Sequence, residues 1–497
     1  VVAVLFILLQ VKRHRLVQCA ALAAMLVFLG VETFTPRFSW SPYYKITQTP
    51  TSANTIKIAV NGVPHQDTAD VLHDPKQVNS FRPWPYQDAG PRNPLSDVLV
   101  VGAGNGNDVA VALAHGAKHV DAVEIDPKLY QIGFDSHPNH PYQDARVSVY
   151  ITDGREYLQQ TRTQYDLILF ALPDSLTLVS GQASLRLESY LFTTEAMQTA
   201  KQHLRPGGSF SMYNTYRQTW LVDRLANTLQ QVYGRTPCLR HYGLTSVVMT
   251  DSATAEVLTC QATWQSAPGA FIPVAATDDY PFLYLETPSL PSLYIWTLLL
   301  IAAGAVIFVR ATGNRIRPMT KFTDLFFMGA AFLLLETKSV VQFALLFGTT
   351  WFVNALVFIG VLVAVLAAIE ISRRWTFRRP RVLYALLLVS LAVAWLVPLD
   401  RLLALDFLPR FVCAVLLAFT PILIANLIFA QRFRDVAESV TAFGANLLGA
   451  MLGGILEYLS LLTGYRALLI VVAVLYGVSL LASPGLLRSV AAIQGQQ

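Results

Sequence analysis

The residues best suited to chemistry lie close together near residue 100. An apolar run, Val98 to Val101, is followed by three glycines and an amide, namely Gly102, Gly104, Gly106 and Asn105. About twenty residues further on, a second apolar run ends in Glu124 and Asp126. Glycines let the backbone approach a ligand closely, and a carboxylate at this place accepts hydrogen bonds from ribose hydroxyls. The stretch predicts a nucleotide-type pocket, and a plain structural turn is the alternative.

Alternating strands and helices are expected to position these residues. The patterns predict strands at 97–101, 119–124, 147–151, 166–170 and 209–213, and helices near 107–115, 127–133, 154–160, 189–203 and 217–232. This alternation favours an α/β doubly wound, mostly parallel sheet. Before it, residues 56–64 alternate apolar and polar side chains and turn at Asn61-Gly62, which indicates a hairpin in a small β-rich piece. The proline-rich residues 74–96 are expected to form a loop.

Composition divides the 497 residues into soluble and membrane parts. Only 14% of the residues are charged, against roughly 25% in soluble proteins. The expected parts are N-terminal transmembrane helices at 1–35, the first of them truncated, the β-rich piece and loop at 36–96, an α/β domain at 97–288, and a helical membrane domain at 289–497. In that last part about seven apolar segments approach the length of a span, at 290–309, 323–347, 350–371, 382–398, 408–430, 440–462 and 466–484.

Short arginine clusters carry most of the net charge of +5 and report topology rather than nucleic-acid binding. They follow the first, third and fifth of these segments, and the intervening loops are far less basic. The positive-inside rule places the basic loops in the cytoplasm. The same parity places the soluble domain on the extracytoplasmic side of a multi-pass protein of the cell membrane. A Cys238–Cys260 disulfide is then an option, since it needs an oxidising compartment. No cysteine or histidine pattern indicates a metal.

Two charges fall inside the apolar segment 323–347. Glu336 and Lys338 are two residues apart, so they point to different helix faces and need partners elsewhere. Charges at this depth cost roughly 2.5–3.5 kcal/mol each, so they usually face a bundle interior or a cavity. A structural polar clasp and a ligand or transport pathway both remain open. The pattern Gly449-x-x-x-Gly453 predicts a close helix contact.

Four motifs in order give the soluble part a resemblance to spermidine synthases. They are Val98 to Asn107, Val123 to Asp126, Thr152-Asp-Gly154 and Tyr165 to Phe170, preceded by the Asn61-Gly62 hairpin with Gln66. The flanking spans look like the membrane-embedded branch of these synthase-like proteins. The resemblance implies a class I S-adenosylmethionine-type (Rossmann-like) fold and aminopropyl transfer from decarboxylated S-adenosylmethionine to a polyamine. It also implies that the three glycines line the donor, that Glu124 holds the ribose, and that Asp153 with Gly154 meets the adenine.

The chain departs from that family at its acids. The family's catalytic segment has two aspartates three apart; here the first is Ala171 and the second survives as Asp174. The acid of the glycine loop is Asn105, and the polyamine-binding stretch is not recognisable in residues 81–88. Cationic donors and polyamines need carboxylates for charge pairing and for proton uptake. The sequence therefore predicts a membrane-anchored transferase with an S-adenosylmethionine-type donor and a cationic or polyamine-like ligand. Methyl transfer from S-adenosylmethionine, and a non-catalytic ligand-binding or sensor module on a membrane carrier, are the alternatives.

Overall fold

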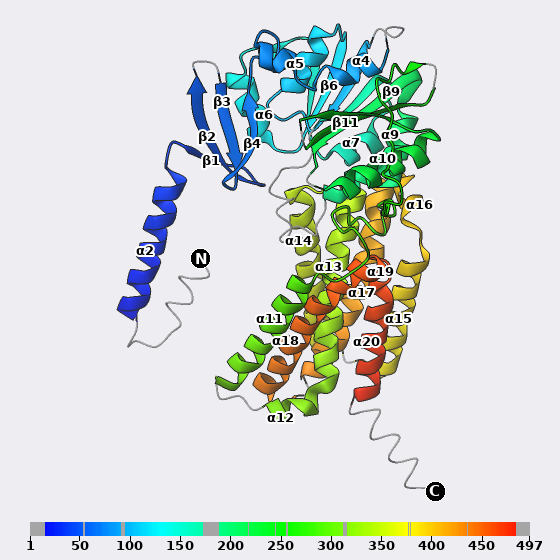
Figure 1. The fold of residues 1–497 in the computed structure, drawn as a ribbon. Helices are drawn as coiled ribbons and strands as arrows, with labels where there is room; N and C mark the ends of the chain where they lie inside the picture. Colours follow the sequence, from blue (N-terminus) through cyan, green and yellow to red (C-terminus); the bar gives the residue numbers. More distant parts are fainter. Residues whose placement is uncertain are drawn as a thin grey trace.

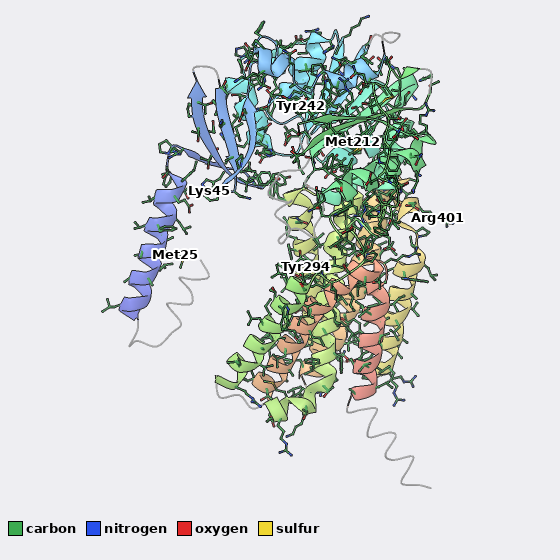
Figure 2. All side chains as sticks on the ribbon, viewed as in Figure 1. Met25, Lys45, Met212, Tyr242, Tyr294 and Arg401 are labelled. Atoms are coloured by element: carbon green, nitrogen blue, oxygen red, sulfur yellow. A yellow bond between two sulfur atoms is a disulfide. The ribbon has the colours of Figure 1, made fainter. Side chains whose placement is uncertain are left out.

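The computed structural model describes residues 15–483, except 53–54, 91–94, 172–187, 217, 244, 255–256, 312–315, 376, 378 and 435. Within these residues a small antiparallel sheet and a larger α/β unit lie above a bundle of long helices (Figure 1). Helix α2 (Arg15–Thr33) lies apart from the bundle and leads into the small sheet. Lys45, which is labelled in Figure 2, is the first residue of the second strand of that sheet. It donates a hydrogen bond to Glu32 near the end of α2.

The small sheet has four strands in the order β1-β2-β3-β4. Their bounds are β1 (Phe38–Trp40), β2 (Lys45–Ser52), β3 (Thr55–Val60) and β4 (Val63–Thr68). The predicted hairpin is present: Asn61 and Gly62 connect β3 and β4 with φ angles of 50° and 82°, as a two-residue hairpin turn requires. The expected loop at 74–96 is wrong in part, because two short helices, α3 (Pro75–Val78) and α4 (Trp84–Asp88), form there with Pro75 and Pro85 in their first turns.

The larger sheet has seven strands in the order β10-β11-β9-β8-β5-β6-β7. Their bounds are β5 (Asp97–Val101), β6 (His119–Glu124), β7 (Val147–Ile151), β8 (Tyr165–Ala171), β9 (Leu204–Thr215), β10 (Cys238–Tyr242) and β11 (Ser246–Ser252). Strands β5 to β9 are parallel, and β11 runs antiparallel to both β9 and β10. The order reverses beside β5, whose carboxyl end carries the glycines, so a ligand is expected at that edge. This confirms the α/β fold of the S-adenosylmethionine type.

Helices cover both faces of this sheet. They are α5 (Asn107–Ala114), α6 (Pro127–Ser136), α7 (Gly154–Gln160), α9 (Thr194–Gln202) and α10 (Thr219–Tyr233), with short 3₁₀ turns η2 (Pro141–Gln143) and η3 (Glu188–Phe192). The strands are apolar on both faces because each face packs against helices. The single helix expected at 189–203 is divided at Thr193, whose hydroxyl caps α9 by accepting from the Ala196 N–H.

Seven apolar segments of the C-terminal part are helical. They are α11 (Ser292–Ala311), α13 (Thr323–Phe347), α14 (Trp351–Arg374), α15 (Pro380–Leu396), α17 (Phe407–Arg434), α18 (Ser439–Leu456) and α20 (Leu468–Ala482), joined by the short α12 (Ile316–Met319), η5 (Thr320–Phe322), α16 (Leu399–Leu403), η6 (Glu457–Leu459) and α19 (Ser460–Thr463). In the described residues four continuous helical stretches are long and apolar enough to cross a membrane: Arg317–Phe347, Trp351–Arg374, Phe407–Arg434 and Ser439–Thr463. The count of about seven spans stays a prediction for α11, α15 and α20, whose apolar stretches are shorter.

Glycines allow α18 to approach α13 closely. A Cβ atom on Gly449 would overlap the backbone of Phe326, and one on Gly453 would overlap the backbone of Ala330. The GxxxG pattern therefore forms the close contact it predicts, with α13 as the partner helix.

The basic helix ends lie together at the end of the bundle that faces away from the α/β unit (Figure 1). Arg432 at the end of α17 pairs with Asp324 at the start of α13 at 2.5 Å, and Arg434 donates to the Ser372 carbonyl near the end of α14 at 3.1 Å. At the opposite end of these helices Thr349 contacts the α/β unit. This arrangement fits the charge parity, and the side of the membrane that each end faces stays a prediction.

Candidate ligand site at the carboxyl edge of the sheet

The glycine loop between β5 and α5 has a backbone that only glycine adopts without strain. Gly102, Gly104 and Gly106 have φ angles of 79°, 53° and 100°. A Cβ atom on Gly104 would overlap the Gln66 side chain, and one on Gly106 would overlap Pro141. The loop is therefore packed from outside by the small sheet and by η2, and Tyr142 of η2 donates to the Gly104 carbonyl at 2.7 Å.

Glu124 holds this loop to the end of β6. One carboxylate oxygen accepts from the Gly104 N–H at 2.7 Å, and the other accepts from the Asp126 N–H at 2.9 Å. Burial raises the pKa of Glu124 to about 7, against the lowering effect of backbone donors that include Ile125. Because an ionised carboxylate offers roughly four acceptor positions, about one remains for a further donor such as a ribose hydroxyl.

Asn105 and Gln66 bring unpaired polar atoms to the loop. The Gln66 side-chain oxygen accepts from the Asn105 N–H at 3.2 Å. Within the described residues, Gln66 Nε2, Asn105 Nδ2 and Asn105 Oδ1 are buried without a hydrogen-bond partner. Each such atom costs roughly 1–3 kcal/mol if it stays unpaired. Three of them beside one glycine loop indicate a place where a polar ligand belongs.

The two predicted aspartates act as helix caps. Asp126 caps α6 by accepting from the Lys128 N–H, and its other oxygen accepts from Ser41 Oγ at 2.6 Å, which ties the small sheet to the larger one. Asp153 caps α7 by accepting from the Arg155 and Glu156 N–H groups at 2.8 and 3.1 Å.

The bundle occupies the second oxygen of Asp153. Thr349, in the corner between α13 and α14, donates to it from the backbone N–H at 3.2 Å and from Oγ1 at 2.6 Å. Beside Asp153, a Cβ atom on Gly154 would overlap the Val101 side chain, so this glycine keeps α7 close to β5.

The acceptor side of the loop is apolar at the position where the family has its first acid. Ala171 ends β8 and is buried, paired in register with Tyr213 of β9. Asp174 lies outside the described residues. Near Tyr213 the only described acid in hydrogen-bond contact is Asp108, which accepts from the tyrosine hydroxyl and has Arg82 Nε at 3.7 Å. Burial raises the pKa of Asp108, and Arg82 opposes that rise.

Sequence patterns gave no indication of three residues at this edge. Tyr43 lies near the cluster of Glu124, Asp126 and Asp153, and burial together with these acids raises its pKa to about 12. Tyr142 and Tyr213 contact the glycine loop and α5 as described above. None of the three tyrosines belongs to a spaced motif. Asp108, the partner of Tyr213, is next to the glycine loop in the sequence and is the member of this group that could have been predicted.

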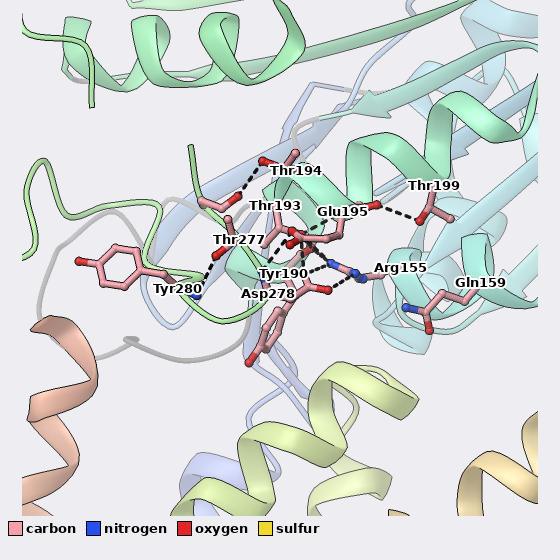
Figure 3. A network of polar contacts seen from close by, with 12 residues as sticks. Arg155, Gln159, Tyr190, Thr193, Thr194, Glu195, Thr199, Thr277, Asp278 and Tyr280 are labelled. Carbon is pink, nitrogen blue, oxygen red and sulfur yellow. Dashed lines mark hydrogen bonds and ion pairs between the residues drawn. The ribbon is translucent and has the colours of Figure 1, made fainter. Parts of the chain in front are cut away.

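A buried ion pair anchors the α/β unit to the segment that precedes the bundle (Figure 3). The Arg155 guanidinium donates to both oxygens of Asp278 at 2.6 Å, and to the Tyr190 carbonyl at 2.8 Å. Two residues on, Tyr280 donates to the Leu461 carbonyl of α19 at 2.8 Å. Helix α7 is thus fixed to the bundle through Asp278 as well as through Thr349.

The charged pair of α13 does not join the glycine loop. Lys338 is buried and donates to Gln342 one turn further along the same helix, whereas Glu336 is half-buried. The two lie on different helix faces, as their spacing predicts. Within the described residues no hydrogen bond connects either of them to the α/β unit, so their role as a ligand site stays a prediction.

The sheet order and the glycine loop define the chain's soluble part as a domain of the S-adenosylmethionine-dependent transferase fold. Residues 90–253 match the spermine/spermidine synthase domain, so the soluble part is a spermidine synthase-like domain. Matched relatives include a polyamine aminopropyltransferase of Korarchaeum cryptofilum (28% identical over 139 residues) and polyamine aminopropyltransferase 2 of Hyperthermus butylicus (33% over 117 residues). These matches cover 27% and 22% of this chain, and they span only 39% and 36% of the two relatives.

Solved structures with a similar fold include two classes of protein. A probable spermidine synthase from Corynebacterium glutamicum is 18% identical, with a TM-score of 0.34. The match covers 45% of this chain and 81% of the synthase chain. Human methyltransferase-like protein 13, solved in complex with SAH, is 24% identical, with a TM-score of 0.29. The match covers 36% of this chain and 79% of the human chain.

Proposed function

We propose that this chain is an integral membrane transferase that binds an S-adenosylmethionine-type donor at the glycine loop. The observation that carries the proposal is the set of three buried, unpaired polar atoms on Asn105 and Gln66. They lie beside Gly104, whose positive φ and lack of Cβ let the Gln66 side chain pack directly against the loop. The donor, when bound, supplies an electrophilic carbon on its sulfonium sulfur.

The chain's own residues suit both ends of such a donor. Glu124 has about one acceptor position left for a ribose hydroxyl, and Ile125 and Pro127 follow it as apolar cover for a base. Asn105 and Gln66 offer two side-chain NH₂ groups to the amino-acid tail. NH₂ groups donate, so they fit a tail that still has its carboxylate.

Aminopropyl transfer follows from the family alone, and methyl transfer is the second candidate. The aminopropyltransferase family uses a donor without the carboxylate, whose cationic tail is matched by an acid. In this chain Asn105 stands in the place of that acid, and Ala171 stands in the place of the acid that accepts the proton. Asn105 favours S-adenosylmethionine itself as the donor, and Ala171 removes the proton acceptor that an attacking amine needs, so both replacements favour methyl transfer.

Calorimetry on the purified full-length chain tests the donor directly. We expect S-adenosylmethionine to bind more tightly than its decarboxylated form, and Asn105→Asp to reverse that order because the new carboxylate pairs with a cationic tail. Gln66→Leu is expected to weaken both by removing an NH₂ donor. Absence of binding by either adenosyl compound would refute the proposal. If binding occurs but turnover does not, and Ala171→Asp restores turnover of a polyamine, the domain is a decayed aminopropyltransferase rather than a methyltransferase.

The extracytoplasmic position of the α/β unit is part of the proposal. Cys238 and Cys260 form a disulfide, with their Cα atoms 5.2 Å apart, which supports an oxidising surrounding. The basic helix ends lie at the opposite end of the bundle, which supports the same side. A reporter that is active only in the cytoplasm can be fused within residues 74–96. If that fusion is active, it contradicts this placement.

A further inference from the structure

A cavity of about 320 Å³ lies where the α/β unit meets the bundle. Its upper wall comes from residues that follow β6 and β7, including Ile125 and Thr152, and from Tyr43. Its lower wall comes from α13, α14 and α17, and all of those bundle residues except Thr350 are apolar, among them Phe347, Trp351 and Leu356. The cavity is therefore an apolar pocket with one polar end. It adjoins the glycine loop site through Ile125 and Pro127, and its lining does not include Asn105 or Gln66.

The apolar wall continues onto the outer face of α14. Phe352 and Leu356 line the cavity, and Ile359 and Val363 extend the same helical stripe further into the span. Phe352, Ile359 and Val363 are 56%, 55% and 59% exposed, so this face of a membrane-spanning helix is open to its surroundings. In a bilayer such a face contacts acyl chains, and Phe352 belongs both to this face and to the cavity lining.

The polar end of the cavity suits a head group that donates hydrogen bonds. Glu156 is the charged residue of the lining, and its carboxylate accepts from Thr152 Oγ1 at 2.7 Å and from Gln160 at 3.0 Å. Arg410 of α17 lies close by, but it donates to the Gln159 side chain at 3.4 Å and to main-chain carbonyls rather than to this carboxylate. The carboxylate thus keeps acceptor positions for a cation.

We propose that this cavity binds an acyl chain of a membrane phospholipid whose amine-bearing head group lies against Glu156 and Thr152. The volume is at the lower end of the roughly 300–1,000 Å³ of small-molecule sites, which suits part of one chain rather than a whole lipid. The aromatic residues Trp351 and Phe352 stand at the start of α14, where aromatic side chains mark the edge of a bilayer. An amine is preferred over a quaternary head group because only the amine donates N–H bonds to a carboxylate.

Native mass spectrometry of the full-length chain, released from nanodiscs of equal phosphatidylethanolamine and phosphatidylcholine, tests this site. We expect one retained phosphatidylethanolamine in the wild-type protein. Leu356→Phe fills the cavity and should lower retention about tenfold. Leu362→Phe makes the same change on an exposed, non-lining position of the same helix and should leave retention unchanged. Glu156→Gln should keep a bound lipid but remove the preference for the amine.

Equal retention in Leu356→Phe and the wild type would mean annular lipid only, and would overturn the proposal. Equal retention of the two head groups in the wild-type chain would overturn the role of Glu156. A measurement on the unaltered sequence covers the case in which a variant does not fold: phosphatidylethanolamine with a photoreactive acyl chain should label peptides within 343–356 more than those within 358–369. Uniform labelling of both would also refute the site. Ile125 and Pro127 border both this cavity and the proposed position of the donor's base, so all of these measurements are made without an adenosyl compound. Failure of lipid retention then leaves the calorimetric test of donor binding untouched.

Discussion

Removing one hydroxyl from the bundle is expected to strengthen nucleoside binding. Asp153 accepts four hydrogen bonds: from Arg155 and Glu156 on one oxygen, and from the N–H and hydroxyl of Thr349 on the other. An ionised carboxylate has roughly four acceptor positions, so these donors fill it. If Asp153 contacts the adenine as the family resemblance implies, the incoming amino group must displace one of them. The Thr349 hydroxyl is the donor that side-chain substitution can remove.

The size of the effect follows from that bond. Hydrogen bonds to charged groups contribute about 1.5–3 kcal/mol, and the Thr349 hydroxyl lies at 2.6 Å from the carboxylate. Thr349→Val keeps the shape of the side chain and removes this donor. Water takes its place in the free protein, so we expect about half of that contribution, or about a 4- to 13-fold gain in affinity for S-adenosylmethionine and for its demethylated product.

Isothermal calorimetry on the full-length chain measures this gain. Thr349→Ser keeps the hydroxyl and is the matched control, so its affinity should equal that of the wild type. Thermal unfolding of each variant separates a local effect from loosening of the junction. Unchanged or weaker binding in Thr349→Val, with Thr349→Ser unaltered, would show that Asp153 is a helix cap only and that Thr349 does not compete with the ligand.

Four further outcomes are expected from single features of the structure. Burial raises the pKa of Glu124 to about 7, and a ribose hydroxyl donates best to the ionised carboxylate, so the donor affinity measured by calorimetry should rise with pH through about 7. Glu124→Gln should remove that rise. Asp251→Asn is the control and should keep it, although the Asp251 carboxyl group also has a pKa of about 7. The raised pKa of Glu124 also stabilises the fold below the unfolded-state value of about 4.5 and loses that stabilisation as the pH rises to about 7, so Glu124→Gln should flatten the decline of thermal stability in this window. Cys238→Ser should lower the free energy of unfolding by about 3 kcal/mol, the value for a loop of this length, and a reducing agent should lower the wild type by the same amount and leave the variant unchanged. Gly449→Ala should lower the melting temperature in detergent because its Cβ overlaps the Phe326 backbone, whereas Gly454→Ala, with only the Leu333 side chain at an ordinary 3.5 Å, should not.

Local patterns in the sequence were enough for the parts of the fold that are set by near neighbours. The first three parallel strands of the large sheet begin and end where the apolar runs predict, and the glycine loop has the backbone that its spacing requires. Glu124 is predictable because it ends a strand at a fixed distance from that loop. The two last strands, β10 and β11, were missed because they are an antiparallel hairpin after the α/β alternation has ended.

Contacts between distant segments could not be predicted. Thr349 meets Asp153 across 196 residues and Arg155 meets Asp278 across 123, and nothing in the local sequence of either pair favours the other member. Each of these contacts involves a residue at the start of α7, where the α/β unit rests on the bundle. No local pattern links the α/β unit to the bundle, so their junction and its cavity could not be predicted from the sequence.

The acids at the carboxyl edge bear on which of the two proposed transfers suits this site. Glu124 and Asp126 hold the loop and a helix start, and Asp153 is filled by four donors. Asp108 is paired with a tyrosine hydroxyl and faces a guanidinium, so it is poorly placed to take a proton from an acceptor. Ala171 offers no proton acceptor at all. Among the described residues the acceptor side thus lacks a free carboxylate, which an ammonium-bearing polyamine would need both for binding and for deprotonation. A methyl acceptor need not carry an ammonium group, so the described residues support the proposed methyl transfer rather than the proposed aminopropyl transfer.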